Sequence, residues 1–90
     1  MHELSLAAGI LDIVREYVAT DQAHRVRAVR VRVGEAAGVV PESLDFCFDA
    51  IVIDTPFASA HLEIDRVSGE ALQVVDFEID DGDDTMEVSA

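Results

Sequence analysis

The 90-residue chain has one cysteine, few basic residues and no long apolar run, and each shortage excludes a class of protein. The single cysteine, Cys47, allows neither an internal disulfide framework nor a zinc site built from several thiolates. No apolar run approaches the ~18 residues of a membrane span, so we expect no membrane partner. The opening residues lack the basic stretch and apolar run of a signal peptide, which makes the cytoplasm the expected location.

Basic residues are scarce: 6 Lys and Arg against 19 Asp and Glu give a formal net charge of −13. The imbalance lies in residues 33–90, which hold fifteen of the acids and a single basic residue, Arg66. A chain this acidic repels phosphate groups, so nucleic acid is not an expected partner. The acidic surface either keeps the protein soluble or meets a basic partner or cations.

Motifs of enzymes and of common ligand sites are also missing. Gly34 and Gly38 lack the spacing and the following lysine of a phosphate-binding loop. If Gly82 were the sixth position of a calcium-binding loop, Phe77 and Ile79 would have to be ligands, and neither side chain binds calcium. We find no acid–base pair, cofactor motif or nucleophile elbow, so the chain is not expected to be an enzyme.

Two amphipathic helices are predicted from the apolar spacing. Two adjacent apolar stripes at three- and four-residue intervals predict a helix over residues 3–19, wide enough to pack on a sheet and a second helix. Pro41 suits the first turn of that second helix, which ends before Pro56. Cys47 lies on its apolar stripe and should behave as a small buried hydrophobe.

A half-buried strand is predicted between the two helices, because valines alternate with Ala28, Arg30 and Arg32 over residues 28–33. The two arginines share one face of this strand. They are either solvated or paired with acids of neighbouring strands, such as Glu63 or Glu78.

A β-hairpin is predicted after the second helix, with strands near residues 61–65 and 72–79 and a turn at residues 68–70. The alternation slips between Val74 and Val75, which indicates a bulge. The resulting helix–strand–helix–strand–strand order predicts one α/β (α+β) domain over residues 1–80, a three-stranded mixed sheet with both helices on one face. Its first two strands should be parallel. Residues 81–90 form an acidic tail that we expect to be frayed.

The amino terminus is the strongest candidate for a metal site. The Met1 amine and the His2 backbone nitrogen would close a five-membered chelate ring, and that nitrogen with the His2 imidazole would close a six-membered one. Planar nitrogen donors suit Ni(II) or Cu(II), with Glu3 available for the fourth position. The alternative is that Met1 is only the initiator and that His2 follows it by chance, without binding a metal. His24 and His61 are expected to face solvent.

Several segments of the chain together carry a family pattern. The most specific of them is the opening MHELSLA of residues 1–7. The others are residues 9–14, 29–35, 38–39, 41–44, 62–64 and 77–79. In these segments, which extend over nearly the whole chain and follow in the family's order, the sequence resembles the HypA/HybF family of nickel metallochaperones for [NiFe]-hydrogenase maturation.

One departure from the family pattern concerns zinc. Family members carry a zinc module of two paired-cysteine motifs between their last two strands. Here residues 66–67 continue directly into Ser68-Gly69-Glu70, and Cys47 replaces none of the missing cysteines. We therefore expect a nickel-binding domain closed by a short turn, with no zinc.

The resemblance implies that His2 is the essential nickel ligand, with the Met1 amine and Glu3 beside it. It also implies delivery of Ni(II) to the [NiFe]-hydrogenase large subunit, together with a HypB-like GTPase, and in some settings to urease. The protein would be a monomer or a weak homodimer. The alternative is a protein-interaction scaffold that kept the fold and no longer delivers nickel.

Overall fold

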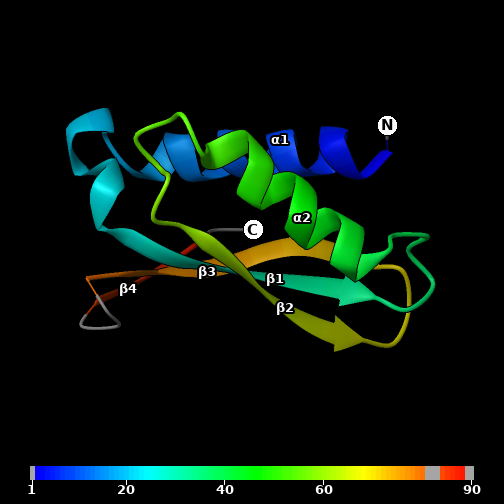
Figure 1. The fold of residues 1–90 in the computed structure, drawn as a ribbon. Coiled ribbons are helices and arrows are strands. Elements are labelled where there is room, and N and C mark those ends of the chain that lie inside the picture. Colours follow the sequence, from blue (N-terminus) through cyan, green and yellow to red (C-terminus); the bar gives the residue numbers. More distant parts are fainter. Residues whose placement is uncertain (1, 81–83, 89–90) are drawn as a thin grey trace.

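The computed structural model describes residues 2–80 and 84–88. Two helices lie side by side on the same face of the sheet, as expected, and the sheet itself has four strands (Figure 1). The elements in chain order are α1 (His2–Tyr17), the short 3-10 helix η1 (Thr20–Arg25), β1 (Val26–Gly34), α2 (Pro41–Val52), β2 (His61–Val67), β3 (Leu72–Ile79) and β4 (Asp84–Glu87). No helix in this described part of the chain is both long and apolar enough to span a bilayer.

The sheet has the strand order β2-β1-β3-β4. β1 and β2 are parallel and joined through α2, which confirms the predicted strand–helix–strand unit. The sheet has four strands and not the three we predicted, because β4 pairs antiparallel with the outer edge of β3. This strand lies within residues 81–90, which we predicted to be frayed. Its backbone pairing with β3 orders residues 84–87 despite their acidic composition. Residues 81–83 and 89–90 of that stretch lie outside the described residues.

The predicted hairpin is wrong, because β2 and β3 lie on opposite sides of β1 and do not pair with each other. The segment from the end of β2 to the start of β3 crosses the end of β1 and accepts hydrogen bonds from residues 34–36. The Gly34 N–H donates to Ala71 O at 2.6 Å, the Glu35 N–H to Val67 O at 2.8 Å and the Ala36 N–H to Gly69 O at 2.8 Å. A central position suits β1 because its valines are the most buried of any strand.

The predicted bulge in β3 is confirmed by the register. Arg30 of β1 faces Asp76 and the next residue, Val31, faces Val74, so Val75 is left without a partner on β1. The extra residue restores the alternation on both sides of the slip, which lets Val74 and Phe77 both face the core.

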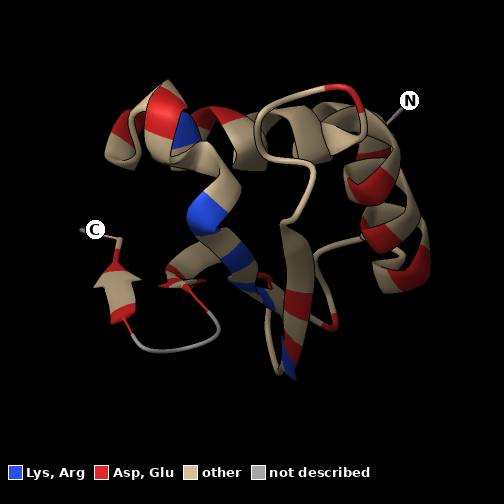
Figure 2. Cartoon of the chain, turned by 60° about the vertical axis from the view of Figure 1, so that its left-hand side comes forward, with Lys and Arg blue, Asp and Glu red and all other residues tan. Residues whose placement is uncertain are grey.

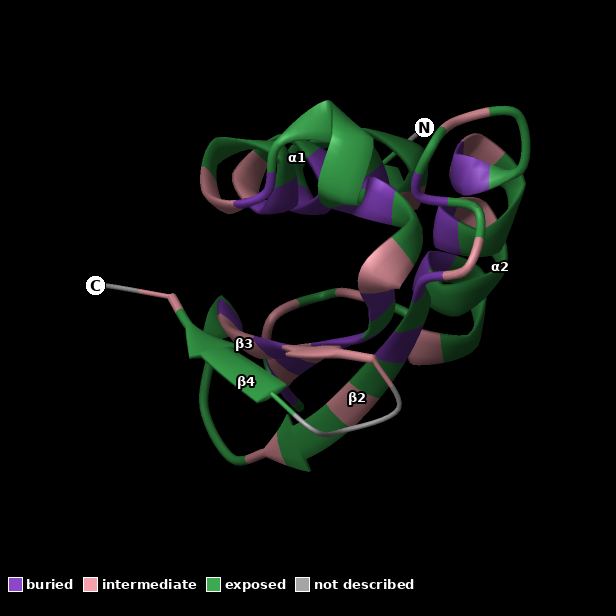
Figure 3. Cartoon of the chain, turned by 90° about the vertical axis from the view of Figure 1, so that its left-hand side faces the viewer, coloured by how far each residue is buried: buried purple, intermediate pink, exposed green. Residues whose placement is uncertain are grey.

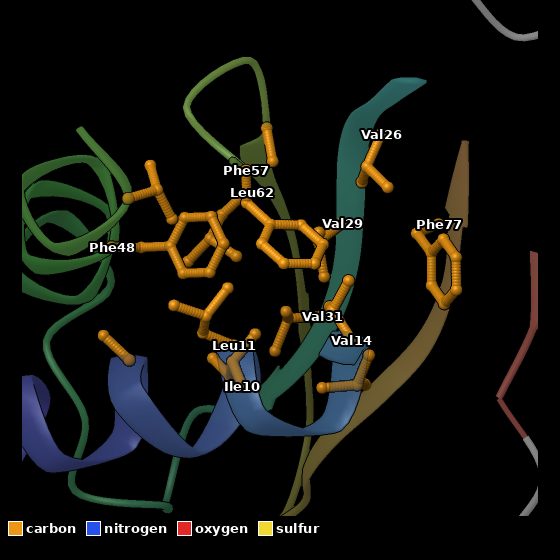
Figure 4. Packing of buried hydrophobic residues seen from close by; sticks show 14 of the residues in the cluster. Ile10, Leu11, Val14, Val26, Val29, Val31, Phe48, Phe57, Leu62 and Phe77 are labelled. Atoms are coloured by element: carbon orange, nitrogen blue, oxygen red, sulfur yellow. The ribbon is translucent and has the colours of Figure 1, made fainter. Parts of the chain in front are cut away.

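The core lies between the helices and the sheet (Figures 3 and 4). Helix α1 contributes Ile10, Leu11 and Val14, and α2 contributes Leu44 and Phe48. The sheet supplies the opposing layer, with Val26, Val29, Val31, Val33, Leu62, Val74 and Phe77 buried. This apolar layer packs both helices against the sheet.

The opposite face of the sheet carries the arginines of β1. Arg30 donates from Nε to Asp76 at 2.7 Å, from Nη1 to Glu63 at 3.0 Å and from Nη2 to Glu78 at 3.2 Å. Arg32 lies 4.0 Å from Asp65. Of the two interpretations of these arginines, pairing with strand acids is therefore correct. The most closely held carboxylate, that of Asp76, was not anticipated, because β3 was placed beside β2.

Candidate metal site at the start of helix α1

Two of the three predicted ligands, His2 and Glu3, lie in the first turn of α1. The His2 side chain is 60% exposed and that of Glu3 20%. The His2 Nδ1 lies 3.6 Å from the Glu3 Oε2. Met1 lies outside the described residues. The imidazole is thus open to solvent, with a carboxylate beside it.

Glu3 is held by a residue far away in sequence. The Val40 N–H donates a hydrogen bond to the Glu3 Oε2 at 3.4 Å. Val40 directly precedes α2 and has no capping side chain of its own, so this carboxylate stands in for a cap. The bond from Val40 lowers the pKa of Glu3, and its carboxyl group is therefore ionised at neutral pH. The contact joins the start of α1 to the start of α2.

The helical position of these residues leaves their backbone nitrogens available. The first four N–H groups of an α-helix have no partner within the helix, and α1 begins at His2. A metal ion can therefore displace the amide protons of His2 and Glu3 without breaking a helical hydrogen bond. This matters because, within residues 2–80 and 84–88, no three His, Cys, Asp or Glu side chains are grouped so as to hold a metal ion.

A hollow of about 340 Å³ adjoins Glu3. Its other lining residues come from the first two turns of α2: Glu42, Ser43, Phe46 and Cys47. Cys47 was predicted to be buried on the apolar stripe. It is half-buried, packing against the core while also lining this hollow. Cys47 directly follows Phe46, which is exposed, and therefore lies at the margin of the apolar stripe. That position in the sequence could have indicated that Cys47 is only partly buried.

The other two histidines do not join this site. His24 lies in η1 and is exposed, as predicted. His61, at the start of β2, is also exposed, and its Nδ1 lies 3.4 Å from the Asp49 Oδ1. Each therefore offers a control for experiments on His2.

Comparison with known proteins decides the family. The family model for hydrogenase/urease nickel incorporation, metallochaperone, hypA, matches residues 1–72. The chain belongs to the HypA family. The hydrogenase maturation factor HypA of Albidiferax ferrireducens is 39% identical over 71 residues, 79% of this chain and 63% of the relative. The HypA of Streptomyces avermitilis is 45% identical over 74 residues, covering 79% of this chain and 55% of the relative.

A solved HypA structure shares the fold. The solution structure of the Ni metallochaperone HypA from Helicobacter pylori matches with a TM-score of 0.61, covering 98% of this chain and 71% of that chain. The sequence identity is 20%, so this likeness concerns the fold alone. This HypA-family chain spans less than two thirds of the length of the curated relatives described above.

Proposed function

We propose that this chain is a nickel carrier that binds Ni(II) at its amino terminus and delivers it during [NiFe]-hydrogenase maturation. The observation that supports this most directly is the exposed His2–Glu3 pair, held at the junction of α1 and α2 in a member of the HypA family. It would act in the cytoplasm, as a carrier and not as a catalyst. Its partners would be a HypB-like GTPase and the hydrogenase large subunit.

The proposed ligand set uses nitrogens of the first residues of the chain. The Met1 amine, the His2 backbone nitrogen and the His2 Nδ1 would occupy three corners of a plane, in fused five- and six-membered rings. Planar nitrogen coordination is a preferred geometry of Ni(II). Glu3 would complete the plane through its backbone nitrogen or its carboxylate. Because Val40 already orders that carboxylate, little side-chain freedom would be lost on binding.

A nickel titration of tag-free protein with a free Met1 amine tests this proposal. We expect one Ni(II) per chain, with the d–d absorption of planar, low-spin nickel. Affinity should rise with pH across the neutral range, because nitrogen ligands must give up their protons before they bind a metal ion. His2→Ala should weaken nickel binding by more than ~10-fold. Removing a group that only hydrogen-bonds to a metal ligand already costs about 10-fold or more in metal affinity, and removing a ligand should cost more.

Acetylation of the Met1 amine is the sharpest test, because it keeps every side chain and removes only that nitrogen as a donor. Binding should weaken as strongly as in His2→Ala, whereas His24→Ala and His61→Ala should match the parent. If the acetylated protein binds nickel as tightly as the parent, the amine is not a ligand and the chelate is wrong. A folded parent that binds no nickel would favour a scaffold that kept the family fold without nickel delivery.

A further inference from the structure

The outward side of α2 carries two large apolar side chains in water. Phe46 is 74% exposed and Ile53 is 68% exposed, the highest values among the large hydrophobic residues of the described chain. Ile53 follows the last helical residue with helical backbone angles, φ −55° and ψ −42°. Seven residues apart, the two side chains therefore lie on one stripe, opposite buried Leu44 and Phe48.

Acidic residues border this stripe. Glu42, Asp45 and Asp49 occupy the same side of the helix and are exposed, and the 12 residues of α2 include no lysine or arginine. Figure 2 shows the helix banded in red without any blue. We call these three acids together with Phe46 and Ile53 the outer α2 face.

The outer α2 face adjoins the proposed nickel site. Phe46 and Glu42 line the hollow whose other wall is Glu3. The Val40–Glu3 hydrogen bond fixes the start of α2 against the first turn of α1. A partner seated on this face would therefore have its own side chains next to His2 and Glu3.

We propose that the outer α2 face docks a basic amphipathic helix of the protein that exchanges nickel with this chain. Apolar side chains at i and i+7 match one face of a helix, and an acidic border is complementary to flanking arginine or lysine. A second copy of the same face would place acids against acids, and anionic lipid or nucleic acid would be repelled in the same way. The role in nickel exchange rests on the function proposed above; the docking itself does not.

The test uses a designed helical peptide of about 20 residues, long enough to form a helix, with leucines on one side flanked by arginines. Labelled peptide is titrated with the folded parent, and amide chemical shifts locate its site. Phe46→Ser and Ile53→Ser should each weaken binding by ~10-fold, as expected for central apolar anchors. Leu72→Ser, which removes an exposed leucine of β3, is the matched control and should bind like the parent. Circular dichroism checks that each variant is folded.

The charge component has its own pair of measurements. Asp45→Asn and Asp49→Asn should weaken binding and reduce its salt dependence, and a peptide with glutamates in place of the arginines should not bind. Equal binding by the Phe46→Ser and Leu72→Ser variants, or equal binding of the acidic peptide, would overturn the proposal. So would a parent dimer that becomes monomeric in Phe46→Ser, because the occupant would then be a second copy.

Nickel titration of the same variants separates the two proposals. Ile53→Ser should keep the parent's nickel affinity, because Ile53 is not a proposed ligand and does not line the hollow beside Glu3. If the parent binds the peptide on the outer α2 face but takes up no nickel, docking stands and the nickel function fails. If nickel binds and the peptide does not, the docking proposal fails and the nickel site stands.

Discussion

Replacing Gly34 by alanine tests whether the β2–β3 connection is packed against the end of β1. A Cβ atom added at residue 34 would lie 2.2 Å from Gly69 O, 2.6 Å from Gly69 C and 2.7 Å from Ala71 N. All three contacts are with backbone, so no side-chain rotation relieves them. The connection must move away, although residues 34, 35 and 36 donate hydrogen bonds to Ala71, Val67 and Gly69 in and beside it.

The expected cost follows from those hydrogen bonds. Three backbone bonds at about 1 kcal/mol net each give ~3 kcal/mol if the connection separates from β1. Alanine regains about 0.4–1 kcal/mol by restricting the unfolded chain. We therefore expect Gly34→Ala to lower the free energy of unfolding by roughly 2 kcal/mol, a large share of the ~5–15 kcal/mol typical of a small domain.

Gly9→Ala is the matched control, since the same atom is added inside α1, where a Cβ would meet nothing within 4 Å. Helix propensity favours alanine there by up to ~1 kcal/mol. Urea denaturation followed by circular dichroism gives both values by linear extrapolation. Should Gly34→Ala prove as stable as the parent while Gly9→Ala is stabilised, the close crossing of the connection over β1 would be refuted.

Two further predictions concern stability. Phe48→Ala, at a fully buried position, should lower the free energy of unfolding by about 3–5 kcal/mol. Phe46→Ala, at an exposed position on the same helix, should change it by less than ~0.5 kcal/mol. Equal losses in urea denaturation would contradict the orientation of α2. Acid should also destabilise the protein through Asp80, because hydrogen bonds from Arg25, at 2.8 and 2.5 Å, lower the pKa of this carboxyl from its usual value. Because this pKa is lower in the folded than in the unfolded protein, the ionised carboxylate stabilises the fold at pH values above the pKa of the unfolded state. That stabilisation is lost as the pH falls through the pKa of the folded state. Asp80→Asn should therefore show a shallower acid slope of the unfolding midpoint, and an unchanged slope would refute the pairing.

The elements of the fold could largely be predicted from local pattern. The apolar stripes placed α1 and α2 to within a few residues, and the slip after Val74 located the bulge. Strand pairing was less accessible, because alternation indicates which side of a strand is buried but not which strand lies next to it. β2 and β3 were therefore joined in a hairpin when β1 lies between them. β4 was missed because Asp84 and Glu87 are poor strand formers, and its backbone pairing with β3 is a tertiary contact.

By itself, the sequence determined the order Met1-His2-Glu3, which we propose as a chelate, and the family resemblance, since both depend on residues adjacent in the chain. Only the tertiary structure decided that Glu3 bonds to Val40, 37 residues away, and that Phe46 borders the hollow beside it. The physical reason is that periodicity assigns a residue to one side of its own helix. Which other element covers that side, or leaves it in water, depends on how both helices pack on the sheet.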